Sequence, residues 1–194
     1  MRKLIFVILL SISFIESVTA MEQSPNTVFL NTTFNIGSFS AGEYDSGSVF
    51  LGGSLSADWI PNGKIGLAYG IETGLLGGKK QTDNSIILGI PVIFRLGWHP
   101  SFINIENTDL FILAKIGWGF GLWGSHLDNG STPGGIVCGI NIGGCYAFTR
   151  LIGVYAETGY NYYGLARNDN YPEYPLGYGS GKIYVTVGVS IRLN

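Results

Sequence analysis

The chain has 194 residues, of which 46% are hydrophobic and 12% are charged, and its net charge at pH 7 is −2. This charge gives no sign of nucleic-acid binding, and the length suits one domain. The mean hydropathy is +0.29, yet no apolar run beyond residue 20 reaches the roughly 18 residues of a membrane-spanning helix. We therefore expect the hydrophobic residues to alternate along β-strands.

The first twenty residues have the pattern of a secretory signal peptide. Arg2 and Lys3 precede a short apolar run over 4–15, and the small-residue end Val18-Thr19-Ala20 follows. This pattern predicts cleavage after Ala20, so that residues 21–194 form the mature domain; an uncleaved anchor is the alternative.

Eight later stretches alternate apolar residues with small or polar ones, which is the period of a β-strand. The last is the clearest, because every second residue from Ile183 to Leu193 is aliphatic. At a tilt near 45°, about a dozen such residues cross the roughly 25 Å apolar band of an outer-membrane barrel. We predict strands over 28–38, 49–60, 64–76, 85–98, 109–123, 135–148, 152–163 and 182–194.

The residues between and within these strands add detail. Pro61-Asn62-Gly63 predicts a tight turn. Pro91 falls inside the fourth strand and predicts a bulge or a locally unpaired stretch. Long and short connections alternate, as in barrels with short periplasmic turns. The exception is 99–108, which we expect to be a longer inner turn containing His99.

The two cysteines, Cys138 and Cys145, lie seven residues apart on one predicted strand. That spacing puts them on opposite faces and over roughly 20 Å apart, too far for a disulfide. We interpret them as small wall or core residues, since no zinc-site spacing accompanies them.

The composition of the two strand faces distinguishes a membrane barrel from a soluble one. The less apolar face consists mainly of Gly, Ser, Thr and Asn, which suits a narrow lumen better than a water-facing surface. The predicted fold is therefore an all-β, eight-stranded, antiparallel, up-and-down transmembrane β-barrel with a closed sheet. The apolar faces end in aromatic residues that we expect to form a girdle at each membrane interface, namely Trp59, Trp98 and Phe148 at one rim and Phe120, Tyr160 and Tyr162 at the other.

Four charged residues fall on the lumen faces: Glu72, Arg95, Lys115 and Glu157. Their formal charges sum to zero, and buried charges are stable only when paired, so we expect one hydrogen-bonded network that plugs the lumen. A selectivity filter or a proton-linked gate is the alternative.

The sequence predicts no catalytic residue, cofactor or metal site. The stretch Gly179-Ser180-Gly181-Lys182 lacks the Ser or Thr that completes a phosphate-binding loop. Lipid A deacylases, one family of outer-membrane barrels, carry a His with a Ser two residues later, and His126 is the candidate for such a histidine. Here Asp128 occupies the serine position, which favours a solvated loop histidine.

The last long connection, 164–181, is rich in tyrosine, proline and charge. Tyrosine and arginine often anchor interfaces, and long loops on rigid scaffolds carry recognition. The candidate recognition residues are Arg167, Asp169, Tyr171, Tyr174 and Tyr178. The alternative is an aromatic rim that packs on lipid headgroups or on its own barrel.

The stretches IPVIFRLGW, AKIGWGFG and YAETGYNY, with the alternating last strand, resemble the small eight-stranded outer-membrane barrels of bacteria, the group of the OmpA transmembrane domain and the OmpX-like and OmpW-like proteins. The resemblance implies a monomer in the cell outer membrane, surrounded by outer-membrane lipid and inserted by the barrel-insertion machinery. That machinery usually reads a terminal aromatic residue, and Leu193-Asn194 departs from the pattern.

The expected role is non-enzymatic. We expect a structural or surface-interaction function, meaning envelope integrity or binding of an extracellular ligand or host surface through the loops. A porin-like narrow channel for small solutes is the alternative, and a lipid-modifying enzyme is the second alternative.

Overall fold

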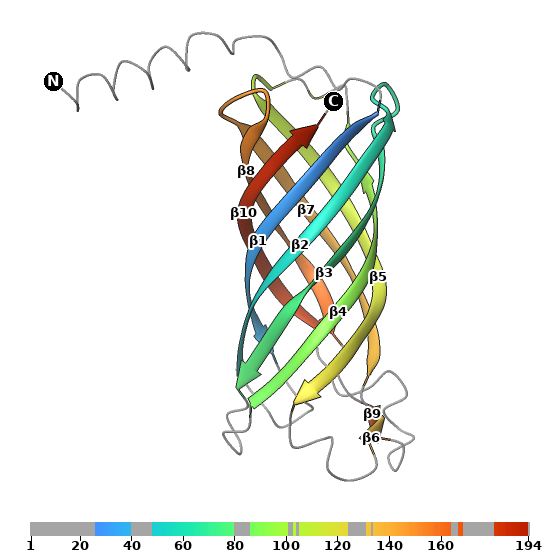
Figure 1. The fold of residues 1–194 in the computed structure, drawn as a ribbon, viewed down its shortest axis with the longest axis vertical. Coiled ribbons are helices and arrows are strands. Elements are labelled where there is room, and N and C mark those ends of the chain that lie inside the picture. The colour runs from blue at the N-terminus through green and yellow to red at the C-terminus, as the bar shows by residue number, and fades with distance from the viewer. Residues whose placement is uncertain are drawn as a thin grey trace, which may run out of the picture.

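The computed structural model describes residues 26–39, 48–79, 86–100, 103, 105–123, 131–132, 134–163, 167–168 and 181–193. Within these ranges, eight long antiparallel strands close into one barrel (Figure 1). They are β1 (Thr27–Phe39), β2 (Ser48–Asn62), β3 (Leu67–Lys79), β4 (Ile86–Trp98), β5 (Thr108–Trp123), β7 (Gly135–Ala147), β8 (Ile152–Tyr163) and β10 (Gly181–Leu193). The predicted all-β barrel is confirmed.

The first and last strands close the barrel. β1 pairs with β10 from Val28↔Leu193 to Gly37↔Tyr184, and with β2 on its other side. The sheet therefore has no free edge, as a hydrocarbon environment requires. The start of β1 and the end of β10 lie at the same end as the connections 63–66, 99–107 and 148–151 (Figure 1). We call this the turn end, and the opposite end the loop end.

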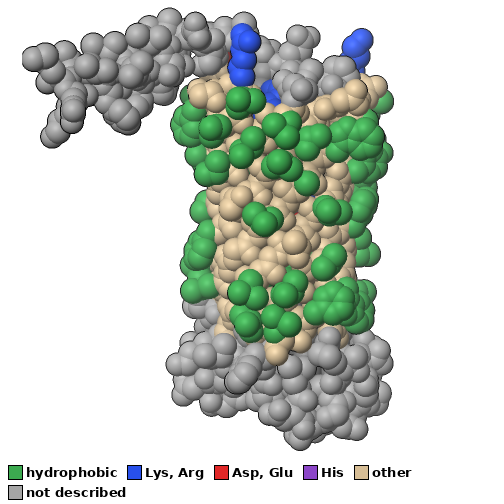
Figure 2. All heavy atoms as spheres, viewed as in Figure 1, with side chains coloured by type: hydrophobic (Ala, Val, Ile, Leu, Met, Phe, Trp, Pro, Cys, Tyr) green, Lys and Arg blue, Asp and Glu red, His purple; other side chains and the backbone are tan. Residues whose placement is uncertain are grey.

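The apolar faces of the strands point outward. On β10, the side chain of Ile183 is 72% exposed, whereas that of its neighbour Tyr184 is 4% exposed. The same alternation runs round the barrel, so hydrophobic side chains lie on its outside, as the visible face in Figure 2 shows. Polar and small residues face inward, together with large apolar side chains such as Phe50 and Phe111. The predicted orientation of the two faces is confirmed, and it is the reverse of a soluble barrel.

The first turn lies further along the chain than predicted. β2 continues through Pro61 to Asn62 with a register shift after Trp59, and β3 begins at Leu67 instead of Lys64. Asn62 closes the turn, because its backbone oxygen accepts from the Gly66 N–H at 3.0 Å and its Oδ1 accepts from the Lys64 N–H at 3.0 Å. Gly66 has φ +70°, and a Cβ there would lie 1.9 Å from the His99 backbone oxygen. Only glycine fits this position.

Pro91 disturbs both ladders of β4, as its position predicted. Pairing with β3 stops at Thr73↔Val92 and resumes at Leu76↔Gly89. Pairing with β5 shifts register between Leu88 and Gly89. The chain thus contains both an unpaired stretch and a bulge, because proline cannot donate to a ladder.

Two short strands that the sequence did not predict lie at the loop end. β6 (Ser131–Thr132) and β9 (Arg167–Asn168) pair antiparallel, so two connections from different hairpins are joined there (Figure 1). The described residues include no helix of the length and hydropathy needed to cross a membrane.

Candidate functional site

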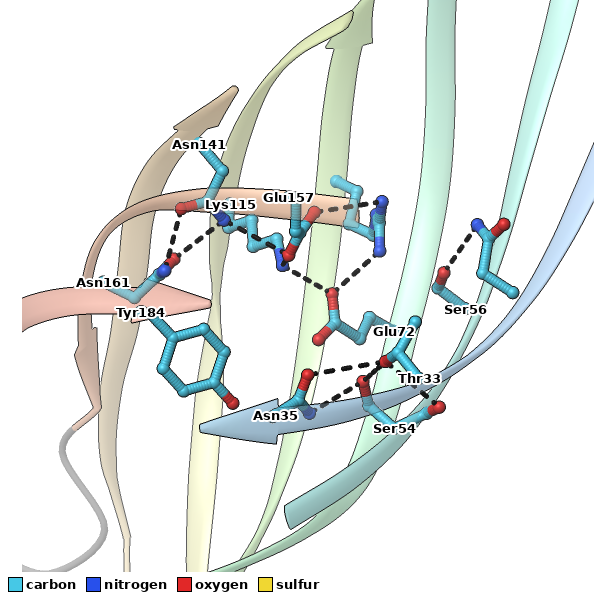
Figure 3. Close-up of polar contacts among 12 residues, drawn as sticks. Thr33, Asn35, Ser54, Ser56, Glu72, Lys115, Asn141, Glu157, Asn161 and Tyr184 are labelled. Carbon is cyan, nitrogen blue, oxygen red and sulfur yellow. Dashed lines mark hydrogen bonds and ion pairs between the residues drawn. The ribbon is translucent and has the colours of Figure 1, made fainter. Parts of the chain in front are cut away.

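A cluster of buried charges occupies the middle of the lumen, and it contains all four residues singled out in the sequence. The Lys115 ammonium lies 2.9 Å from Glu72 Oε2 and also pairs with Glu157 Oε1, as Figure 3 shows. Arg95 Nη1 donates to Glu72 Oε2 at 2.9 Å. Each of these residues is at most 4% exposed. Charges buried this deeply are stable only in such mutual contact.

Two further residues, Asp58 and Tyr155, complete the cluster. Arg95 Nε lies 3.0 Å from Asp58 Oδ1, and Arg95 Nη2 donates to the Tyr155 hydroxyl at 2.8 Å. That hydroxyl in turn donates to Glu157. Three carboxylates therefore face two cations, and the cluster carries one formal negative charge when all five groups are ionised. Asp58 faces inward, as the alternation of its strand requires, but it is not among the four residues predicted to form the network.

The register of β2, β3 and β4 explains why Asp58 contacts the cluster. Asp58 pairs with Gly70, and Gly70 pairs with Arg95. Because the intervening residue has no side chain, Arg95 reaches across β3 to the carboxylate. A Cβ on Gly70 would lie 2.0 Å from Asp58 Oδ1.

Neutral polar side chains line the lumen around the charges and hydrogen-bond to one another. Asn141 and Asn161 exchange amide hydrogen bonds of 3.1 and 2.8 Å (Figure 3). Gly139 and Gly159 lie opposite them, and a Cβ on either glycine would come within 2.1 Å of an asparagine oxygen. A second group, on β1 and β2, consists of Thr33, Asn35 and Ser54.

The turn end of the lumen is filled by aromatic rings that contact one another. His99 lies 5.9 Å from Phe29 and 5.4 Å from Phe111, and Phe111 lies 5.3 Å from Tyr155, measured between ring centroids. His99 Nδ1 is 2.7 Å from Asp109 Oδ2. His99 is only 5% exposed. His99 lies in the predicted turn, but its burial against the two phenyl rings was not predicted, because the chain folds inward there.

The loop end of the lumen is filled by an apolar cluster, which consists of Phe50, Leu76, Ile93, Val137, Tyr163 and Tyr184. A cavity of about 10 Å³ lies on the turn-end side of the charges, among residues that include Asn31, Asp58 and Arg95. One water molecule needs about that volume. Side chains thus occupy the described lumen at both ends and in the middle, as expected for eight strands.

The aromatic residues predicted to form girdles point outward. Trp59, Trp98 and Phe148 are exposed near the turn end, and Phe120 and Tyr160 are exposed toward the loop end, whereas Tyr162 is half-buried. The indole Nε1 of Trp98 donates to the Ile65 backbone oxygen at 3.2 Å, which fixes the ring at the rim. Tyr69 and Tyr146, not predicted for this role, are exposed near the same end.

Of the predicted loop recognition residues, only Arg167 lies within the described residues. Arg167 lies in β9, where its backbone pairs with Thr132. Asp169, Tyr171, Tyr174 and Tyr178 lie outside the described residues, as do His126 and Asp128.

The two cysteines are both free, with Cys138 exposed and Cys145 buried, so their predicted placement on opposite faces is confirmed. Within the described ranges, no group of three or more His, Cys, Asp or Glu residues is placed to hold a metal ion.

Comparison with known proteins identifies the fold. No family model matches the chain, and no curated protein matches it. Among solved structures, Neisserial surface protein A (NspA) aligns with a TM-score of 0.57 at 17% identity, over 88% of this chain and 97% of NspA. The outer membrane protein OprG from Pseudomonas aeruginosa aligns with a TM-score of 0.59 at 7% identity, over 91% of this chain and all of OprG. The chain has the fold of small outer-membrane β-barrels, and the resemblance seen in the sequence is confirmed at that level.

Proposed function

We propose that this protein is an integral outer-membrane barrel with a closed lumen, which serves envelope integrity or binds an extracellular ligand or host surface through its loops. The observation that carries the proposal is the filled lumen, with aromatic rings in contact at the turn end, five charged groups in the middle and an apolar cluster at the loop end. A barrel filled in this way can present loops from a fixed position in the membrane, but it offers solutes no open path through the lumen.

The outside of the barrel supports the membrane location. An outward apolar face, aromatic residues toward both rims and a closed sheet are the features that a bilayer requires. The signal-peptide pattern supports export with cleavage after Ala20. A monomer in outer-membrane lipid, inserted by the barrel-insertion machinery, is part of the same proposal.

The location is tested by fractionation and by gel mobility. We expect the protein in the outer-membrane fraction, with faster migration on SDS gels before heating than after. The closed lumen is tested in planar bilayers, where we expect no steady open level. A stable unitary conductance would contradict it.

A second candidate is a narrow channel for small apolar solutes, and the interrupted pairing between β3 and β4 favours it. The gap adjoins Leu76 and lies two residues from Ile93, and both are members of the apolar lumen cluster. A solute-uptake assay in vesicles that compares the wild type with Pro91→Ala distinguishes the channel from the closed barrel. The alanine restores a backbone N–H donor at the gap. Uptake that falls in this variant would establish the channel.

We do not propose an enzymatic activity. Mass spectrometry of envelope lipids from cells with the wild-type chain and with His126→Ala tests this, and identical lipid profiles are expected. A lipid change that depends on His126 would contradict the proposal.

A further inference from the structure

The outer face of β5, β7 and β8 is hollowed by a groove of about 640 Å³. Small residues, Gly143 and Ala156, form part of its lining, and larger aliphatic side chains border it, among them Leu110, Ile112 and Ile142. Ile112 and Ile142 are register partners on adjacent strands. The groove therefore runs across neighbouring strands, and its lining extends to Ile103 in the 99–107 connection and to Val185 on β10.

The polar groups that border the groove are occupied elsewhere. The Thr158 hydroxyl donates to the Tyr184 backbone oxygen at 2.9 Å. The Glu157 carboxylate is held inside the lumen by Lys115 and Tyr155. The groove thus offers no free hydrogen-bonding group from these two residues, and its chemistry fits a hydrocarbon chain.

A positive charge lies at the turn end of β7 and β8, two of the strands that form the groove. Arg150 and Leu151 are exposed in the 148–151 turn that joins β7 to β8. Phe148 and Tyr146 pack edge to face beside them, with centroids 5.4 Å apart. In the view of Figure 2, the visible Lys and Arg side chains lie at the turn end, beyond the hydrophobic belt.

The spacing between the charge and the groove matches one membrane leaflet. From Leu151 to Ala156 the strand advances by about 17 Å at roughly 3.3 Å per residue. At a tilt near 45° this is about 12 Å along the membrane normal, and one leaflet has about 15 Å of hydrocarbon. A headgroup at Arg150 would place its acyl chain at the depth of the groove.

We propose that this groove holds an acyl chain of one anionic phospholipid, whose headgroup phosphate is bound by Arg150. The inference rests on the proposed outer-membrane location. A cation beside an apolar groove matches an anionic headgroup joined to a hydrocarbon chain. A second copy of the chain fits less well, because its described outer surface offers Arg150 a single carboxylate, that of Glu106 in the 99–107 turn.

The test is native mass spectrometry of the barrel after gentle extraction from vesicles of mixed phosphatidylethanolamine and phosphatidylglycerol. We expect the wild type to retain one phospholipid, with phosphatidylglycerol preferred. Ala156→Leu fills the groove and should abolish retention. Arg150→Gln should keep a bound lipid but lose about fivefold in preference for phosphatidylglycerol, which corresponds to the roughly 1 kcal/mol of one basic residue at an anionic surface.

Matched controls are available on the opposite side of the barrel. Ala57→Leu adds the same side chain to the outer face of β2, and Lys64→Gln removes a charge from the 63–66 turn. Both should retain lipid as the wild type does. Equal retention by Ala156→Leu and Ala57→Leu would overturn the proposal, and so would a dimer peak that disappears in Ala156→Leu. Co-flotation of each variant with vesicles tests the membrane location separately from lipid retention. Every variant should float with the vesicles, whatever the result of the retention test.

Discussion

Arg95 and Asp58 form an ion pair across the intervening strand β3, with Nε 3.0 Å from Oδ1. Gly70 stands between them in register and makes the reach possible. Through Glu72, Lys115 and Glu157 the same cluster continues to β5 and β8. The lumen charges therefore connect five of the eight long strands, and their loss should weaken the barrel as a whole.

Removal of the arginine should be severely destabilising. Arg95→Ala leaves Asp58 without its cation and Glu72 with Lys115 alone, and breaking a buried ion pair costs about 3–5 kcal/mol. Urea unfolding of protein refolded in phosphatidylcholine vesicles measures the change in the free energy of unfolding. Lys64→Ala at the exposed 63–66 turn is the control and should change it by less than about 0.5 kcal/mol. Equal urea midpoints for the two variants would rule out a structural role for the cluster.

The carboxylates should differ in their contributions. Glu72 contacts both Arg95 and Lys115 at 2.9 Å, so Glu72→Gln should cost about 3 kcal/mol. Asp58 is the third carboxylate against two cations, and Asp58→Asn keeps an acceptor for the Asn31 amide while removing the formal excess of negative charge. We expect a cost below about 1 kcal/mol by the same urea titration. A larger loss for Asp58→Asn than for Glu72→Gln would contradict this account.

The paired asparagines depend on the glycines opposite them. In Gly159→Ala the new Cβ would lie 2.1 Å from Asn141 Oδ1 and 2.2 Å from the Ile140 backbone oxygen. We expect a loss of about 1–3 kcal/mol from overpacking. The matched control is Gly53→Ala, whose Cβ would meet only the Thr33 backbone oxygen at 3.6 Å. Unfolding midpoints that fall equally in both variants would show that the amide pair is not the cause.

A charge scan along β10 tests which face meets lipid. Val187 is 48% exposed near the middle of the strand, and Leu193 is 44% exposed at its turn end. Arginine near the bilayer midplane costs about 2–4 kcal/mol, and near an interface about 0–1 kcal/mol. Val187→Arg should therefore destabilise the barrel in vesicles far more than Leu193→Arg. The reverse order would place the membrane elsewhere on the barrel.

The strands were predictable because each side of the barrel selects residues of one kind. On β10 the aliphatic residues from Ile183 to Leu193 all point outward, so a period of two was enough. The first turn was misplaced because Pro61 and Asn62 remain in the strand across a register shift. Turn-forming residue types alone do not reveal a register shift. The Asn62 Oδ1 that accepts from the Lys64 N–H and the positive φ of Gly66 decide where the chain reverses.

The lumen was predictable in part. Alternation placed Glu72, Arg95, Lys115 and Glu157 on one side of the sheet, and the cost of burying charge predicted that they would meet. Asp58 and Tyr155 were missed because their contacts depend on the stagger between strands, which single-strand patterns do not contain. His99 was missed because its burial results from the path of a turn and not from a period.

The pairing of Val28 with Leu193 brings the two ends of the folded barrel next to each other. A short linker could join them, and the chain could be reopened within the 148–151 turn without breaking a single ladder. Such a circular permutant would have β8 first and β7 last. In the closed barrel every long strand is paired on both sides. The free energy of unfolding should therefore depend little on which strand comes first in the chain.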